Sequence, residues 1–311
     1  MNKEKISILL ATYQGANYIR EQIQSVLDQT YLKWELFVRD DCSSDSTLSI
    51  IREFVAIDER IKIVPNNDER LGACQNFSEL MRVADVDSYI MFCDQDDIWL
   101  PNKLHESIKA MKILESNYGQ DKNFVVYGNY SLMNHQGKPL SIPNPDYSTK
   151  PTLQLLLSQN YIYGCTMLIN KKLLNLSSPI PQAAENHDYW IALTALVNDG
   201  YFIHINEPLL YYRQHLNNVS GSYKNAFFKN RLSRIFSTSE IMGIRSRLRM
   251  FTDLYEKFKD TMTDKNRTLV SGYINSVEKG GVNAVGFCAI NGIRRRGLVQ
   301  TSLFYINLFR S

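Results

Sequence analysis

The fold of this chain is decided by residues 89–104, which read YIMFCDQDDIWLPNKL. The first five residues are apolar or aromatic and predict a buried strand over Tyr89–Cys93. Asp94-Gln95-Asp96-Asp97 follows at once, and three carboxylates in four residues repel one another. Mg²⁺ and Mn²⁺ prefer oxygen ligands of this kind. The segment therefore predicts either a divalent-metal site or a solvated acidic turn that caps the next helix.

The sequence on either side alternates between strand and helix patterns. The expected strands are 5–11, 34–38, 61–64, 89–93 and 124–127. The helices expected between them include 72–83 and 102–114. Strands separated by helices are joined by right-handed crossovers into a parallel sheet. Ligands bind beyond the carboxyl ends of such strands, which here carry Thr12-Tyr13, Arg39-Asp40-Asp41 and Asp94–Asp97.

The remainder of the chain has weaker strand signals. The four prolines in 138–151 predict an extended loop, and short strands are expected at 167–169, 201–205 and 209–212, with a helix over 187–197. After residue 220 the pattern is mainly helical, with breaks expected at Gly243, Gly272 and Gly280-Gly281. We therefore expect a catalytic domain over residues 1–220 and a helical region over 221–311.

The charges divide in the same way. Residues 221–311 carry 16 Lys and Arg against 6 Asp and Glu, whereas residues 1–220 carry 19 against 26. A basic segment that ends in the amphipathic stretch Leu298–Phe309 favours an anionic membrane surface. The alternatives are a solvated helical cap and a nucleic acid. We expect no nucleic acid, because no DNA- or RNA-binding motif accompanies the charge.

Several other classes of protein are disfavoured. The five cysteines form no Cys-x-x-Cys pair, which argues against a disulfide scaffold or a structural zinc site. Glycine-rich nucleotide motifs and the Gly-x-Ser-x-Gly elbow are absent from the sequence. The first residues lack the long apolar core of a secretion signal. We therefore expect a cytoplasmic protein whose bound metal supplies most of any phosphate neutralisation.

Three ordered motifs resemble the family 2 glycosyltransferases. They are Ile6–Tyr18 (ISILLATYQGANY), Val38–Thr47 (VRDDCSSDST) and Cys93–Leu104 (CDQDDIWLPNKL). The resemblance continues through Asn160–Leu168 (NYIYGCTML), His187–Trp190 (HDYW) and Tyr211–Asn218 (YYRQHLNN), and covers about residues 4–221. This last set is most similar to the bacterial rhamnosyltransferase-like branch. The resemblance implies a GT-A fold, with a Rossmann-like, mostly parallel sheet flanked by helices and a C-terminal helical extension.

The resemblance also implies an inverting sugar transfer from a nucleoside-diphosphate sugar. By position, Thr12 and Tyr13 line the base pocket, and Asp40 accepts a hydrogen bond from the pyrimidine N3–H. A carboxylate is the natural acceptor for that imide group. Asp41 lies toward the ribose, and Asp94 touches the ribose or a metal-bound water.

The diphosphate is expected beside a divalent metal, Mn²⁺ or Mg²⁺. The resemblance implies that Asp96 coordinates this metal. It implies that Arg213 and His215 approach the diphosphate or the metal from the far side. A surface position is the alternative for His215. Positive charge stabilises the leaving diphosphate more in the transition state than in the ground state.

On the acceptor side, the resemblance implies that Asp188 is the general base. Glu185 is the alternative, because many relatives carry Glu-Asp at this point and the local string is Glu185-Asn186-His187-Asp188. His187 is expected to position Asp188, and Trp190 either stacks on a sugar or belongs to the core. The residues expected to border the acceptor are Gly164, Cys165, Thr166, His187 and Trp190.

The donor expected first is dTDP-L-rhamnose, by resemblance alone. UDP-galactose, UDP-galactofuranose and UDP-N-acetylhexosamine are the alternatives. The expected acceptor is a lipid-linked saccharide in cell-surface polysaccharide synthesis, such as capsule or cell wall, with the enzyme peripheral on the inner face of the cell membrane. A nucleotidyltransferase and a non-catalytic nucleotide or sugar binder are the rival functions.

Overall fold

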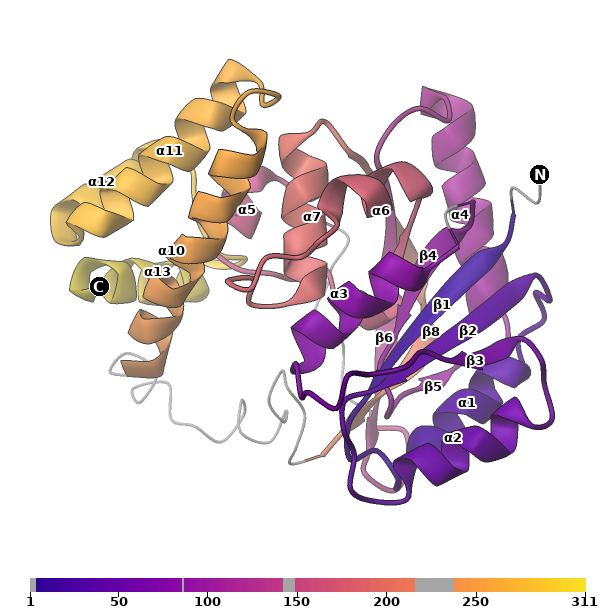
Figure 1. Cartoon of the computed structure of the whole chain (residues 1–311). Coiled ribbons are helices and arrows are strands. Elements are labelled where there is room, and N and C mark those ends of the chain that lie inside the picture. The colour runs from indigo at the N-terminus through magenta and orange to yellow at the C-terminus, as the bar shows by residue number, and fades with distance from the viewer. Residues whose placement is uncertain (1–3, 86, 142–148, 216–237) are drawn as a thin grey trace.

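The computed structural model describes residues 4–85, 87–141, 149–215 and 238–311. Its centre is one eight-stranded sheet with the order β3-β2-β1-β4-β7-β6-β8-β5 (Figure 1). Half of the sheet consists of the parallel strands β1 (Ile6–Thr12), β2 (Trp34–Asp40), β3 (Ile61–Ile63) and β4 (Tyr89–Cys93). All five residues of β4 are buried, as expected for a strand covered on both faces.

The other half of the sheet is mixed in direction. It consists of β5 (Ile98–Trp99), β6 (Phe124–Asn134), β7 (Leu168–Ile169) and β8 (Tyr201–Gln214). β7 is antiparallel to both β4 and β6, β5 is antiparallel to β8, and β6 is parallel to β8. The two strands expected at 201–205 and 209–212 are one strand, because its pairing with β6 continues through register shifts around Asn129.

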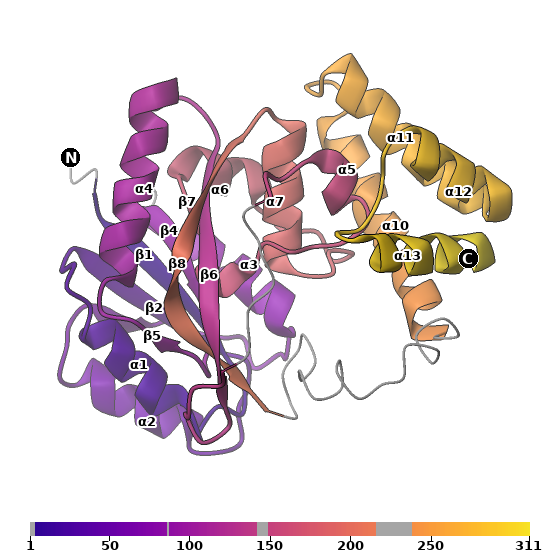
Figure 2. The same ribbon diagram turned by 180° about the vertical axis from the view of Figure 1, so that it is seen from behind.

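Helices cover both faces of the sheet, as the two opposite views show (Figures 1 and 2). On one face lie α1 (Ile19–Leu27), α2 (Thr47–Val55) and α4 (Lys103–Tyr118). On the other lie α3 (Ala73–Val83), α6 (Lys171–Ser177) and α7 (His187–Val197). The short α5 (Leu153–Leu156) and the 3-10 helix η1 (Gly164–Thr166) come before β7. This arrangement confirms the predicted GT-A-like α/β architecture.

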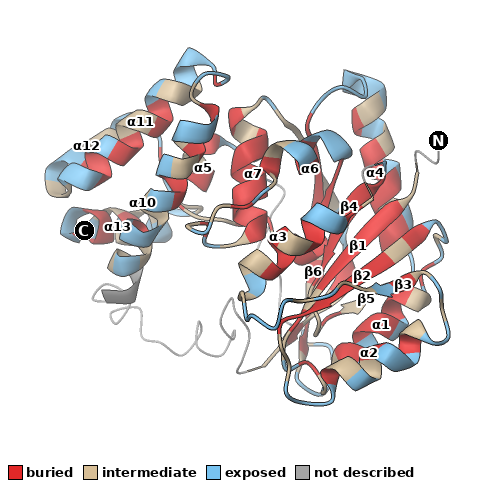
Figure 3. Ribbon diagram, viewed as in Figure 1, coloured by how far each residue is buried: buried red, intermediate tan, exposed pale blue. Residues whose placement is uncertain are grey.

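The C-terminal region forms four packed helices beside α7 (Figure 1). They are α10 (Thr238–Phe258), α11 (Asp264–Lys279), α12 (Gly281–Ile290) and α13 (Leu298–Arg310). Aromatic contacts join them to α7, with Phe251 against Tyr189 and Phe258 against Trp190. One hydrophobic core therefore extends from the sheet into these helices, as the buried residues in Figure 3 show. The proposed domain boundary at 220/221 lies outside the described residues.

Two of the three breaks expected in this region are wrong. A break does occur at Gly280-Gly281, where both residues have positive φ angles of 65° and 55°. Gly243 and Gly272 instead lie inside α10 and α11. A Cβ atom at Gly272 would lie 2.4 Å from the ring of Phe287. This glycine therefore allows α12 to pack closely on α11. Among the described helices, none has the length and apolarity that a bilayer span requires.

Candidate active site

The carboxyl ends of β1, β2 and β4 meet at one edge of the sheet. The strand register pairs Thr12 with Asp40 and Leu10 with Cys93. The two residues that follow each strand therefore lie close to those of its neighbour. This register places Thr12, Tyr13, Asp40 and Asp94 at the same edge, as the sequence predicts.

A glutamine inside the acidic segment joins β1 to β4. Gln95 Oε1 accepts hydrogen bonds from Thr12 Oγ1 (2.6 Å) and from the Tyr13 N–H (2.9 Å), and Gln95 Nε2 donates to the Tyr13 carbonyl (2.9 Å). A Cβ atom at Gly15 would lie 2.2 Å from Gln95 Oε1. The Arg70 guanidinium lies 3.9 Å above the ring of Tyr13. Neither Gln95 nor Arg70 was predicted as a site residue.

The paired aspartates after β2 have different surroundings. Asp40 accepts hydrogen bonds from the Ser43 N–H (2.7 Å) and the Ser43 hydroxyl (2.6 Å). Asp41 accepts hydrogen bonds from the Leu71 and Gly72 N–H groups, each 2.8 Å, at the start of α3. These bonds use both oxygens of a buried carboxylate. Asp41 therefore anchors the loop before α3, which does not fit its expected contact with a ribose.

The acidic segment after β4 divides into exposed and buried carboxylates. Asp94 and Asp96 are partly exposed, whereas Asp97 is completely buried. Asp96 Oδ2 lies 2.6 Å from His215 Nε2, and the His215 ring stacks on Tyr18. Asp97 Oδ1 accepts a hydrogen bond from the Arg213 N–H, while its Oδ2 has no partner in the described part of the chain.

The pKa values of Asp94 and Asp97 in this segment are raised, because burial and the neighbouring carboxylates disfavour their ionisation. Although Asp94 is partly exposed, the loss of water around its carboxylate, followed by the charges of Asp96 and Asp188, raises its pKa to about 7. Burial raises the pKa of Asp97 well above its usual range. Lys103 lies beneath them, donates to the Cys165 carbonyl (2.7 Å), and has a pKa lowered by burial to about 8. The excess of negative groups here would favour a bound cation.

The residues present fit a hard divalent metal. Carboxylate oxygens of Asp94 and Asp97 and the Cys165 thiol lie within 4.8 Å of one another. Burial raises the pKa of Cys165 well above the ordinary value, so the thiol stays protonated and is a poor ligand. The orphaned Oδ2 of Asp97 and the Asp96–His215 pair provide the oxygen and imidazole donors that Mg²⁺ or Mn²⁺ can use.

Asp188 lies in the first turn of α7, facing η1. Its Oδ2 accepts from the Gly164 N–H (2.8 Å), and its Oδ1 accepts from the Tyr189 N–H (2.6 Å) and from Asn160 Nδ2 (3.0 Å). These bonds lower its pKa, but burial outweighs them and raises the pKa to about 6. A buried carboxylate with a pKa near neutrality is suited to accept a proton.

His187 is buried between two phenylalanines. Its ring centroid lies 3.9 Å from that of Phe77 and 4.9 Å from that of Phe92. Its Nε2 has no hydrogen-bond partner among the residues described, and burial lowers its pKa to about 3. A Cβ atom at Gly164 would lie 2.3 Å from that Nε2. The neutral ring therefore packs against Gly164, the residue whose N–H holds Asp188.

The other predicted acceptor-side residues occupy buried positions. Cys165 and Thr166 lie in η1 with their side chains in the interior. Trp190 is 1% exposed, and its indole N–H donates to the Ser177 carbonyl (2.8 Å). Stacking of Trp190 on a sugar does not fit this position, and its alternative role in the core does. Glu185, the alternative base, lies 3.7 Å from Arg247 of α10.

Arg213 is held by several protein groups and is 1% exposed. Its guanidinium donates to the Asp96 carbonyl (2.8 Å), the His135 carbonyl (3.2 Å) and Glu21 Oε2 (2.5 Å). The predicted contact of Arg213 with a diphosphate does not fit so many internal bonds. The position fits a residue that supports the Asp96–His215 pair from β8.

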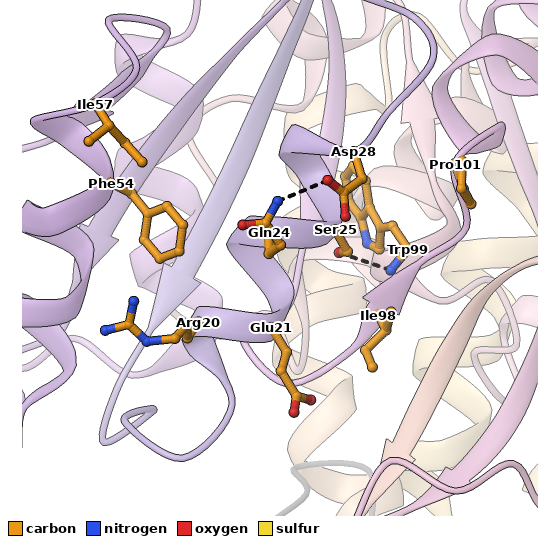
Figure 4. A pocket seen from close by; sticks show the side chains of 10 residues that line it. All are labelled: Arg20, Glu21, Gln24, Ser25, Asp28, Phe54, Ile57, Ile98, Trp99 and Pro101. Atoms are coloured by element: carbon orange, nitrogen blue, oxygen red, sulfur yellow. Dashed lines mark hydrogen bonds between the residues drawn. The ribbon is translucent and has the colours of Figure 1, made fainter.

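A separate cavity of about 580 Å³ lies between α1, α2 and β5. Phe54, Ile57 and Ile98 line it, together with charged residues of α1 (Figure 4). The Ser25 hydroxyl accepts a hydrogen bond from the Trp99 N–H at its inner wall. None of the predicted site residues lines this cavity, so we do not assign the donor to it.

Comparisons with known proteins identify the family. A match to the family described as "Glycosyl transferase family 2" covers residues 7–176. The dTDP-rhamnosyl transferase RfbG of Shigella flexneri is 30% identical over 236 residues, which are 73% of this chain and 78% of that protein. The UDP-Glc:alpha-D-GlcNAc-diphosphoundecaprenol beta-1,3-glucosyltransferase WfgD of Escherichia coli is 35% identical over 202 residues, which are 64% of this chain and 73% of that protein.

Solved structures show the same fold at low sequence identity. S. aureus TarS 1-349 in complex with UDP-GlcNAc has a TM-score of 0.57 at 14% identity, covering 98% of this chain and 89% of that chain. The mannosyltransferase PcManGT from Pyrobaculum calidifontis in complex with GDP-Man and Mn²⁺ has a TM-score of 0.51 at 18% identity, covering 92% and 73%. The chain therefore belongs to glycosyl transferase family 2 and is a glycosyltransferase with the GT-A fold.

Proposed function

We propose that this chain transfers a sugar from a pyrimidine nucleoside-diphosphate sugar to a saccharide acceptor, with inversion at the anomeric carbon. The observation that carries the proposal is the placement of Asp188. This carboxylate accepts a hydrogen bond from the Gly164 N–H (2.8 Å), and the thiol of the next residue, Cys165, lies within 4.8 Å of carboxylate oxygens of Asp94 and Asp97. A proton acceptor and a cluster of potential metal ligands therefore face the same space at the edge of the sheet.

The donor base binds at the ends of β1 and β2 in this proposal. Thr12 and Tyr13 are held by Gln95, and Asp40 is fixed by Ser43. A carboxylate so fixed can accept the N3–H of uracil or thymine. The similarity to RfbG favours dTDP-L-rhamnose as the donor. The similarity to WfgD keeps a UDP-sugar as the alternative.

The proposal includes a divalent metal that Asp96 and His215 would hold, with Asp94 toward the ribose or a water on that metal. When bound, such a metal supplies positive charge to the leaving diphosphate. The chain's own contribution is to orient these ligands. Arg213 fixes the Asp96 backbone, and Tyr18 stacks against the His215 ring.

The proposed chemistry is a single displacement. Asp188 accepts the proton of the incoming acceptor hydroxyl while that oxygen forms a bond to the anomeric carbon. The bond from that carbon to the diphosphate oxygen breaks, and its electron pair leaves with the diphosphate. Attack from the face opposite the leaving group inverts the anomeric configuration. The Gly164 N–H and Asn160 hold the Asp188 carboxylate in place for this transfer.

The proposed acceptor is a lipid-linked saccharide in cell-surface polysaccharide synthesis. The name of WfgD describes a diphosphoundecaprenol-linked acceptor, which supports this class. The excess of Lys and Arg in residues 221–311 supports attachment to the inner face of the cell membrane.

Thermal-shift measurements with dTDP- and UDP-sugars, each with and without Mn²⁺, test the donor and the metal. We expect one nucleotide sugar to raise the melting temperature in the presence of Mn²⁺. Asp96→Ala should abolish that metal-dependent shift. No shift with any nucleotide sugar would contradict the proposal.

The second test separates an enzyme from a binding protein. Asp188→Asn should retain the nucleotide-induced shift and lose turnover by about 10²-fold or more, because the amide cannot accept the hydroxyl proton. Glu185→Gln is the matched control and should retain turnover. Unchanged sugar transfer by Asp188→Asn would exclude Asp188 as the base. A chain that binds the nucleotide but transfers no sugar to any acceptor would be a non-catalytic binder.

A further inference from the structure

The last two helices leave apolar side chains uncovered. On α12, Val282 is 72% exposed and Ile290 is 86% exposed. Ala289 is also exposed, and a Cβ atom at Gly286 would meet only open space. These positions recur every three to four residues and so lie on one side of the helix. No residue of α12 is charged.

The following helix repeats this pattern. On α13, Leu298 is 84% exposed, and Val299, Ile306 and Phe309 are also exposed. At 100° per residue these four side chains fall within a sector about 100° wide. Phe304 and Leu308 lie on the opposite side of α13 and are buried. We call the exposed apolar residues of α12 and α13 the hairpin surface. The two helices lie side by side at the end of the molecule away from β3 (Figures 1 and 3).

The segment that forms the hairpin surface carries charge of one sign. Residues 279–311 contain five basic residues and no Asp or Glu. Three of them are Arg294, Arg295 and Arg296, in the connection between α12 and α13, and Arg294 is exposed. Exposed apolar side chains beside a purely basic segment are the combination that binds the interface of an anionic bilayer.

We propose that the hairpin surface docks this glycosyltransferase on an anionic lipid bilayer. The apolar side chains enter the boundary between headgroups and acyl chains, and the basic residues lie at the level of the lipid phosphates. A nucleic acid would neutralise the arginines but would leave Leu298 and Phe309 against water. A second copy of the chain would place another purely basic segment against this one. The bilayer is the partner that satisfies both the apolar and the basic groups.

The hairpin surface is connected to the acceptor side of the site. The Ser158 hydroxyl donates to the Arg294 carbonyl (2.8 Å), and the Arg296 guanidinium lies 5.1 Å above the Tyr161 ring. Asn160, between these two contacts, donates to Asp188. Docking would therefore hold Asp188 close to the lipid surface, where a lipid-linked acceptor would lie. This last step rests on the proposed function. The docking itself assigns a surface to the membrane attachment proposed above and does not depend on the proposed sugar transfer.

Co-sedimentation of the full chain with vesicles tests the docking. One vesicle is pure phosphatidylcholine, and the other contains equal parts of phosphatidylcholine and phosphatidylglycerol. We expect binding to the phosphatidylglycerol vesicles. The double variant Leu298→Ser with Phe309→Ser should bind roughly tenfold or more weakly, because two large apolar side chains no longer leave water. Arg294→Ala should weaken binding about fivefold.

The matched control is Leu32→Ser with Ile57→Ser. These residues are 69% and 74% exposed and lie outside the hairpin surface, so this variant should bind the vesicles like wild type. Docking would be overturned if wild type bound neither vesicle. It would also be overturned if the Leu298/Phe309 variant bound like wild type. Concentration-dependent dimerisation that this variant abolishes, without vesicle binding, would assign the surface to a second copy and would overturn docking.

The nucleotide-induced thermal shift keeps the two proposals separate. The hairpin variants should retain the shift of wild type, because their side chains are exposed and far from the ends of β1 and β2. Vesicle binding without a nucleotide shift would support docking and contradict the proposed donor site. A nucleotide shift without vesicle binding would support the donor site and overturn docking.

Discussion

Two opposing influences act on the pKa of Asp188. Three N–H donors stabilise its charged form, from Gly164, Tyr189 and Asn160. Burial disfavours that form more strongly and raises the pKa to about 6. A base with this pKa is charged at neutral pH and holds a proton well enough to take one from a hydroxyl. If Asp188 is the base, as proposed, its surroundings set the pH range in which the chain transfers sugar.

The turnover number should fall as the pH drops below about 6, by about tenfold per pH unit. The reason is that protonated Asp188 cannot accept the acceptor hydroxyl proton. Glu185 also raises the pKa of Asp188. Glu185→Gln should therefore keep turnover, and its turnover number should begin to fall at a slightly lower pH. Sugar transfer at saturating substrate, followed from about pH 5 to pH 8, measures both effects. A rate that stays constant down to pH 5 would rule out this role for Asp188.

His187 should make the folded state sensitive to acid. Burial lowers its pKa to about 3 from an ordinary value of 6.5, so between these values the unfolded chain binds a proton that the folded chain does not. The free energy of unfolding is therefore highest above pH 6.5 and falls with decreasing pH, by up to about 1.4 kcal/mol per unit. His187→Leu should remove this contribution. Urea unfolding of wild type and of His187→Leu at several pH values gives the difference between their free energies of unfolding. A difference that does not change with pH would disprove the claim.

Carboxylates inside ordered motifs were the candidate site residues that the sequence indicated most directly. The motifs pointed to Asp40, Asp94, Asp96 and Asp188. The structure places Asp40, Asp94 and Asp96 at one edge of the sheet and Asp188 in the first turn of α7. Gln95, Asn160 and Arg70 were not predicted, because an amide or a surface arginine has no distinctive pattern. The burial of Lys103 and of Trp190 depends on which elements cover them. That information is tertiary and cannot be obtained from local spacing.

At the scale of elements, glycines have opposite effects in two neighbouring helices. Gly272 of α11 faces the Phe287 ring, which leaves no room for a Cβ atom. Gly286 of α12 faces open space. Both interrupt helical sequence, and by propensity alone each would cost about 1 kcal/mol relative to alanine. Only the packing distinguishes them.

Gly272→Ala should lower the free energy of unfolding by roughly 1–3 kcal/mol, because the new methyl group must displace the Phe287 ring or separate α11 from α12. Gly286→Ala is the matched control and should raise the free energy of unfolding by up to about 1 kcal/mol. Guanidinium unfolding measured by circular dichroism would show the two changes. The same sign for both substitutions would mean that Phe287 does not pack as described.

Element boundaries were predicted well where the local sequence alone indicates the whole strand or helix. β4 matches its expected range, and α7 does as well. β5 has two residues and exists because it pairs with β8, so no local pattern could have revealed it. The same reason explains why β8 is continuous. Glu207 and Pro208 in its middle are weak strand formers. Pro208 pairs with Asn129 of β6, and Glu207 lies in the register shift beside it.

At the scale of the whole molecule, the sheet and the C-terminal helices share one core. Phe251 packs against Tyr189, and the Tyr189 ring belongs to the helix that carries Asp188. The three tryptophans, Trp34, Trp99 and Trp190, are buried and lie in the part of the chain that precedes α10. Trp34 and Trp99 therefore report on the sheet, and Trp190 reports on α7 and on its contact with Phe258 of α10. Circular dichroism reports on all helices.

We expect the chain to unfold in one transition, because the C-terminal helices cannot separate without exposing the core side of α7. Tryptophan fluorescence and far-ultraviolet circular dichroism should give the same urea midpoint. Phe251→Ala should lower that midpoint for both signals together, with a loss of about 3–5 kcal/mol in the free energy of unfolding. Different urea midpoints for the two signals would show two independent units.

The contacts of Ser158 and Tyr161 with the α12–α13 connection restrict how this enzyme can be recombined with its relatives. The family match ends at residue 176, which makes that point an obvious place to join two parents. A graft made there would bring a foreign α7 and foreign C-terminal helices to the native segment 149–161. The incoming residues would have to replace both Arg294 and Arg296 as its neighbours. Exchange of acceptor preference by recombination should therefore succeed only when segment 149–161 and everything after residue 186 come from the same parent.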